Sequence, residues 1–150
     1  MRQPVKPIAL VIALVALIGM AFLLFSALYA ERDYVHVAGP FYLTYFETED
    51  QMSLFRCPTG PRGVGCAIDG LPDATVFAAG ADTRYVVVAR HPLGNRNVTE
   101  YFYFARTDRE SRGWGNGPEK IIGPISADAF DAAQAKLRLP PLSIVMDDLK

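Results

Sequence analysis

The sequence contains few of the side chains that bind metals or carry redox chemistry. Its 150 residues include two cysteines, Cys57 and Cys66, and two histidines, His36 and His91. A zinc site usually takes four ligands, with cysteines two to four residues apart and a second pair completing the set. Here eight residues separate the cysteines, so we expect no metal site. A Cys-x-x-Cys redox motif is also absent.

Signatures of catalysis are missing as well. No serine lies in the context of a nucleophile elbow, and the carboxylates fall in expected turns. The acidic segment 47–50 lacks the alternating ligands and central glycine of a calcium loop. The glycine-rich segment 108–120 is expected to lead into a strand, whereas phosphate-binding loops lead into a helix. We therefore predict no catalytic, cofactor-binding or metal-binding residues, and no enzyme.

The chain is also not basic. Residues 31–150 carry 13 lysines and arginines against 16 aspartates and glutamates. A weak negative charge opposes the neutralisation of phosphates that drives nucleic-acid binding, and it gives no electrostatic grip on anionic lipid. We expect a protein partner, whose identity the sequence does not give, and no nucleic acid.

One long apolar run dominates the first part of the chain. Residues 8–30 contain no charged side chain and would span roughly 34 Å as a helix, whereas a bilayer core needs about 20 residues. A transmembrane helix in the lipid bilayer is therefore predicted. The alternative is a cleaved signal peptide, whose apolar core is usually shorter; a cut after Ala30 would put Leu28 at a position that favours small residues. Glu31 stands where a lipoprotein would have cysteine.

The charges around this run predict its orientation. Arg2, Lys6 and the amino terminus precede it, and Glu31, Arg32 and Asp33 follow it. The positive-inside rule then places residues 1–7 in the cytoplasm and everything after the helix outside it. We expect residues 31–40 to be a linker and a first strand, and residues 41–150 to form an extracytoplasmic domain.

The segment RCPTGPRGVGC, residues 56–66, follows the predicted helix and is therefore expected to lie outside the cytoplasm. Disulfides form and persist outside the cytoplasm, so a Cys57–Cys66 bond is predicted; two buried free thiols are the alternative. Proline and glycine between the cysteines are typical of turns, and we expect strands on both sides, at 52–55 and 67–70. Closing such a loop contributes roughly 2.5–3 kcal/mol in the chain-entropy model.

Short strands and one helix account for the rest. The segment TRYVVVAR, 83–90, is apolar on both faces and is predicted to be central in a sheet. It is expected to pair with TEYFYFART, 99–107, through aromatic and β-branched side chains. Further strands are expected at 41–46, 75–80 and 120–123.

The clearest helix signal begins at Ser126. This residue is predicted to be the N-cap, and Ile125 and Phe130 have the spacing of a hydrophobic staple. Pro140 is expected to end the helix region. The predicted fold is therefore α+β: a transmembrane helix, then an antiparallel β-meander of about six short strands with one C-terminal helix packed on it.

A weak candidate interaction surface consists of Trp114, Arg90 and Arg96. Trp114 lies between glycines and either packs back on the domain or offers a contact. Several arginines gather around the hairpin 83–107 and form either an anion-binding patch or, as we favour, solvated strand ends paired with nearby acids. His91 is interpreted as a residue at the end of a strand.

The C-terminal half resembles a loose group of small uncharacterised bacterial envelope proteins, which are secreted, lipidated or single-pass anchored. The resemblance rests on AGADTRYVVVARHP, EYFYFAR and the tail GPISADAFDAAQAKLRLP. The matching tail positions are Gly123, Pro124, Ile125, Ser126, Phe130, Leu137, Leu139 and Pro140. The resemblance implies a strand-rich body and a location in the bacterial envelope, and it assigns no catalytic residue. Together with the orientation predicted from the flanking charges, it leads us to expect an inner-membrane protein with a periplasmic domain.

Three functions compete on these grounds. The first is a membrane-anchored periplasmic binding or accessory protein of the bacterial envelope. The second is an immunity or inhibitor protein that acts on a toxin or hydrolase at the membrane. The third, which we do not favour, is a hydrolase that uses carboxylates brought together by folding.

Overall fold

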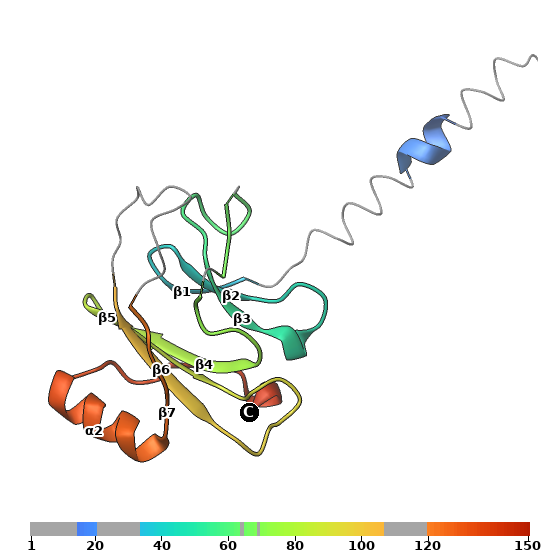
Figure 1. The fold of residues 1–150 in the computed structure, drawn as a ribbon. Coiled ribbons are helices and arrows are strands. Elements are labelled where there is room, and N and C mark those ends of the chain that lie inside the picture. The colour runs from blue at the N-terminus through green and yellow to red at the C-terminus, as the bar shows by residue number, and fades with distance from the viewer. Residues whose placement is uncertain (1–14, 21–33, 64, 69, 107–119) are drawn as a thin grey trace, which may run out of the picture. The chain divides into compact units, whose positions relative to one another are not determined.

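The computed structural model describes residues 15–20, 34–63, 65–68, 70–106 and 120–150 (Figure 1). The chain divides into two units, residues 1–33 and 34–150. Residues 15–20 are helical, and the rest of the predicted transmembrane segment 8–30 lies outside the described residues. Within the described part of the chain, no helix has the length and apolar character needed to cross a membrane.

Residues 34–150 form an α+β structure, as predicted, but with two antiparallel sheets in place of a single meander. The three-stranded sheet has the order β1-β2-β3 and the five-stranded sheet the order β7-β6-β5-β4-β8. The strands are β1 (Val35–Ala38), β2 (Phe41–Thr44), β3 (Ser53–Arg56), β4 (Val76–Ala81), β5 (Tyr85–Arg90), β6 (Glu100–Ala105), β7 (Ile122–Ile125) and β8 (Ile144–Val145). One α-helix, α2 (Ala127–Leu137), and two 3₁₀ turns, η1 (Glu49–Gln51) and η2 (Asp147–Leu149), complete the described elements.

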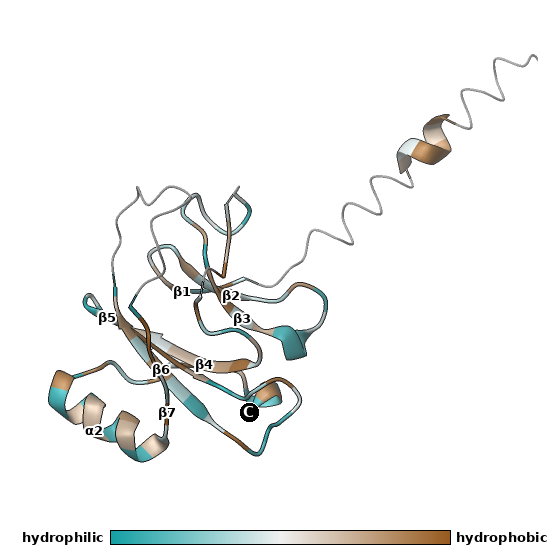
Figure 2. Cartoon of the chain, in the orientation of Figure 1, coloured by the Kyte–Doolittle hydropathy of each residue, from teal (hydrophilic) through white to brown (hydrophobic). Residues whose placement is uncertain are grey.

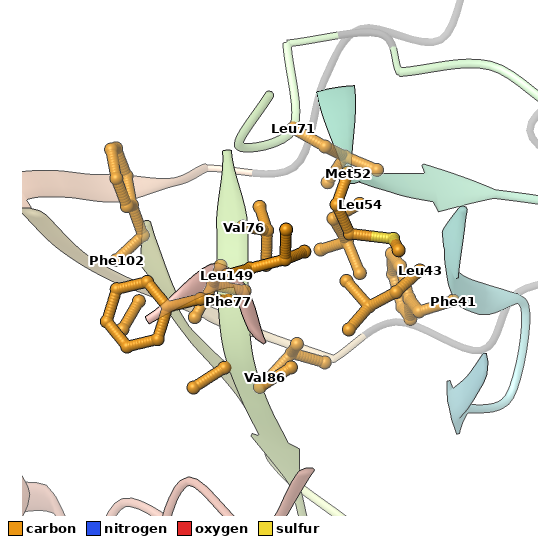
Figure 3. Close-up of a cluster of buried hydrophobic side chains, with 14 of the residues drawn as sticks. Phe41, Leu43, Met52, Leu54, Leu71, Val76, Phe77, Val86, Phe102 and Leu149 are labelled. Carbon is orange, nitrogen blue, oxygen red and sulfur yellow. The ribbon is translucent and has the colours of Figure 1, made fainter. Parts of the chain in front are cut away.

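The larger core lies between the two sheets. Side chains of Phe41, Leu43 and Leu54 point from the small sheet toward Val76 and Val86 on β4 and β5 (Figure 3). All five are fully buried. The chain splits into two sheets because each sheet thereby buries an apolar face against the other, an arrangement that a single meander does not provide.

Strand β5 is central, as its sequence predicts. Val86, Val87, Val88 and Ala89 are all fully buried. Val86 and Val88 belong to the core between the sheets, whereas Val87 faces a second, smaller core under α2. The expected pairing with β6 is confirmed, because Val86 lies opposite Phe104. Val87 and Val88 lie opposite the two residues that precede Phe104 in β6.

Helix α2 covers the other face of the large sheet. The Ser126 hydroxyl accepts a hydrogen bond from the Ala129 N–H, which confirms the predicted N-cap. Phe130 is the helix's one buried residue, and its ring stacks on Tyr101 with centroids 4.8 Å apart. Ile125 packs in the same cluster. Figure 2 shows both hydrophilic and hydrophobic residues along the helix, as expected of a helix at the periphery.

Two expected strands differ in the structure. The described residues of segment 67–70 form no strand, and a bridge of two backbone hydrogen bonds joins Ala67 to Arg56. The strand expected at 120–123 lies instead at β7, which includes Pro124. Proline has no N–H to donate and is tolerated there because β7 is an edge strand.

The C-terminal ten residues were not predicted to have regular structure, yet they complete the fold. Strand β8 pairs with β4, opposite Ala78 and Ala79. Leu149 in η2 is buried in the core between the sheets. Gly80 permits the approach of this segment, because a Cβ at that position would collide with the Pro141 carbonyl oxygen.

Candidate interaction site

The Cys57–Cys66 disulfide is present, as predicted. Cys57 follows β3 and is buried, and the two Cα atoms lie 4.1 Å apart. Between them the chain makes successive turns, in which Gly60 N–H donates to the Cys57 carbonyl and Gly63 N–H to the Gly60 carbonyl, each at 3.0 Å. The bond therefore closes an exposed two-turn loop at the end of β3.

The Arg90 side chain interacts mainly with neighbouring residues of the same domain. Its Nε lies 2.9 Å from a Glu100 carboxylate oxygen, directly across the β5–β6 pair. Its Nη1 bonds Asp73, and its guanidinium lies over the Phe102 ring at 5.0 Å. The side chain is 19% exposed, so little of it remains for a partner. This agrees with the expected pairing of strand-end arginines with nearby acids.

Arg84 and Arg106, two further arginines around the hairpin 83–107, form hydrogen bonds at the turn between β4 and β5. Arg106 N–H donates to the Arg84 carbonyl at 2.7 Å, so the two are cross-strand neighbours as expected. Asp82 accepts the backbone N–H groups of Arg84 and Tyr85, each at 2.7 Å. The Arg84 hydrogen bond, more than any other contact, lowers the pKa of Asp82 below its ordinary value, because it favours the ionised carboxylate.

The two histidines lie in different parts of the fold. His36 on β1 donates to the Gly39 carbonyl oxygen at 3.1 Å. His91 follows β5, as expected of a strand-end residue, but it is buried, with 4% exposed. Its ring stacks on Phe77 with centroids 4.4 Å apart. Sequence reasoning missed this burial; the one available signal was its position at the end of β5, one residue beyond the four buried residues of that strand.

His91 also fixes the base of the β5–β6 loop. Its Nδ1 lies 2.7 Å from the Val98 carbonyl oxygen, which can only accept, so Nδ1 carries the proton. Two backbone hydrogen bonds join His91 to Thr75. The Nε2 atom is buried and has no hydrogen-bond partner in the described part of the chain. The buried imidazole of His91 therefore links the two ends of the β5–β6 loop.

Arg96 joins three segments that are distant in sequence. Its Nη2 lies 2.6 Å from Asp50 Oδ1 in η1, and its Nη1 lies 3.1 Å from the Asp148 carbonyl oxygen in η2. Figure 1 shows η1, η2 and the β5–β6 loop at the same end of residues 34–150. We call segments 45–51, 92–98 and 146–150 together the Arg96 end. Of the two predicted surface residues that the structure describes, Arg96 is exposed between loops and Arg90 is largely covered. Trp114 lies outside the described residues.

The Arg96 end carries exposed apolar side chains as well as charge. Leu93 is 67% exposed, Phe46 58% and Val98 42%. Segment η1 itself is hydrophilic (Figure 2). Over the described residues, no group of three or more histidine, cysteine, aspartate or glutamate side chains could hold a metal ion. The described part of this end therefore combines exposed apolar side chains with charged ones.

Comparison with protein families, with curated proteins and with solved structures found no match to this chain.

Proposed function

We propose that this chain is a single-pass inner-membrane protein of the bacterial envelope, anchored by residues 8–30, whose domain at 41–150 binds another envelope component in the periplasm. The anchor is supported by the uncharged run of about 23 residues, preceded by Arg2 and Lys6. Residues 34–150 form a compact unit of their own, as a tethered domain requires.

The observation that carries the location is the Cys57–Cys66 disulfide. Structural disulfides persist in oxidising compartments and are rare in the cytosol. The bond lies in the part of the chain that follows the apolar run, which is the part that the positive-inside rule exports. Two independent features, charge asymmetry and a disulfide, thus favour the same side of the membrane.

Binding is favoured over catalysis by how the charged side chains are used. Arg90, Glu100 and Asp73 neutralise one another at a strand end. Asp82 is committed to the backbone of the β4–β5 turn. Arg96 and Asp50 connect two loops. These groups organise loops and strand ends, and the apolar side chains between them offer contact area.

Reporter fusions test the topology. Because Leu149 is buried in the core, the reporter should follow Lys150 through a flexible glycine–serine linker that leaves η2 in place. Alkaline phosphatase, which is active only outside the cytoplasm, should be active in this position, and a reporter that works only in the cytoplasm should be silent. Inserting the same reporters before residue 8 should give the opposite pattern. Cytoplasmic activity after Lys150 would refute the proposed topology.

A further inference from the structure

The exposed apolar side chains of the folded unit are unevenly distributed. Among the described residues from 34 onward, five large apolar side chains are exposed. Three of them lie at the Arg96 end: Phe46, Leu93 and Val98. Isolated exposed apolar residues are ordinary on protein surfaces, but these three lie on two segments that the Arg96–Asp50 ion pair holds together.

The loop that presents Leu93 is restrained by hydrogen bonds within the loop and to other segments. The Asn95 N–H donates to the Pro92 carbonyl at 2.8 Å, and the Asn97 N–H donates to the Asn95 side chain at 3.2 Å. The buried His91 side chain donates a hydrogen bond to the Val98 carbonyl oxygen. On the exposed side of the loop, Arg96 donates hydrogen bonds to residues of η1 and η2. A surface that is ordered before binding loses less conformational entropy when a partner arrives.

The charge around these side chains indicates the chemistry of the occupant. The exposed carboxylates of the Arg96 end are Glu47, Glu49, Asp50, Asp147 and Asp148. Arg96 already pairs with Asp50, which leaves Lys150 as the other basic side chain of these segments. An acidic rim repels anionic lipid and a second copy of the same rim, and it attracts a surface that carries lysine or arginine.

We propose that the Arg96 end is the docking surface of this protein, and that its partner is a protein with an apolar pocket bordered by basic side chains, into which Leu93 inserts. The proposal rests on the binding function proposed above and names the surface and the partner chemistry. Buried apolar anchors at the centre of an interface carry most of its binding energy, and a charged rim adds attraction and orientation.

Photo-crosslinking in intact cells tests the surface. The full chain should carry p-benzoylphenylalanine at Leu93, or at Ala132 on the exposed side of α2 as a control, and crosslinked peptides should be identified by mass spectrometry. We expect crosslinks from position 93, and not from 132, to an apolar peptide of another protein next to lysine or arginine. Crosslinks from 93 to lipid, to a second copy of the chain, or to an acidic or uncharged surface would overturn the proposal.

The same experiment separates the two proposals. Crosslinks from 132 with none from 93 would keep the binding function and refute the docking surface. The absence of protein crosslinks at both positions, and at an additional probe on Arg62 in the disulfide loop, would refute the binding function itself. With the partner identified and purified, Leu93→Ser should weaken binding at least tenfold, whereas Ile122→Ser, at an exposed position on β7, should leave it unchanged. Equal losses would contradict the proposal.

Arg96→Gln tests the role of the restraint. This variant keeps Leu93 but removes the ion pair with Asp50, so we expect weaker binding, with the affinity restored in part by Arg96→Lys. Binding to the partner should also weaken at high salt for the native chain, because a rim of opposite charges is screened. Affinity that does not change with salt would argue against a basic partner surface.

Discussion

The packing of α2 on the five-stranded sheet should depend mainly on one side chain, that of Phe130. Phe130 is the helix's one buried residue, and it stacks on Tyr101 in the smaller core. Phe130→Ala removes the burial of an aromatic side chain, worth about 1.5–3 kcal/mol, and a stacking contact worth about 0.5–1.5 kcal/mol. We therefore expect the free energy of unfolding to fall by about 3 kcal/mol, at the low end of the range for buried phenylalanine because a helix at the periphery can settle into the space.

This loss is measurable by urea unfolding. A change of about 3 kcal/mol should lower the urea midpoint by about 1–3 M, and circular dichroism of the full chain in detergent reports the transition. Phe46→Ala is the matched control, since it makes the same chemical change at a side chain that is largely exposed; its cost should stay below about 1 kcal/mol. Hydrogen exchange should show faster opening of α2 in Phe130→Ala alone. Equal losses in both variants would refute the reasoning.

Three further predictions concern stability. Replacing Cys57 and Cys66 together by serine should lower the free energy of unfolding, measured in urea, by roughly 2.5–3 kcal/mol. Thiol labelling of the unsubstituted chain, denatured without reduction, should find no free cysteine; two labels would contradict the disulfide. Gly80→Ala should lower the melting temperature, because its Cβ would displace the Pro141 carbonyl, and an unchanged melting temperature would mean that the C-terminal segment does not pass there. Asp82→Asn should remove a stabilisation that depends on pH. The lowered pKa of Asp82 makes its contribution fully present above its ordinary value of 3.8 and lost as the pH falls through the folded-state pKa, so the native chain and this variant should converge in acid; a difference that persists there would count against the assignment.

The local elements of this fold could be read from sequence because their causes lie close together in the chain. The continuous apolar run of β5 predicted a central strand, and its four core residues are fully buried. Ser126 and Phe130 predicted the start of α2 and the side chain that holds it, since capping and staple contacts span only a few residues. The spacing of Cys57 and Cys66, together with the apolar run before them, predicted the disulfide.

The candidate site shows where this kind of reasoning ends. Arg96 was selected as a surface residue because it lies among the arginines around the predicted hairpin 83–107, but its partners Asp50 and Asp148 lie 46 and 52 positions away. Nothing in the local sequence relates these three residues. The burial of His91 is likewise set by Phe77 on the neighbouring strand β4, whose approach depends on the pairing of the sheet.

Sequence alone therefore determined the central strand β5 and its pairing with β6, the start of α2, where the disulfide forms, and how charge is distributed along the chain. Only the tertiary structure decided that the strands form two sheets, that β8 and Leu149 complete the core, and that three loops meet around Arg96. The physical reason is distance along the chain. Caps, turns and periodic patterns act over a few residues, whereas sheet order and loop contacts depend on which apolar faces bury one another after the whole chain has collapsed.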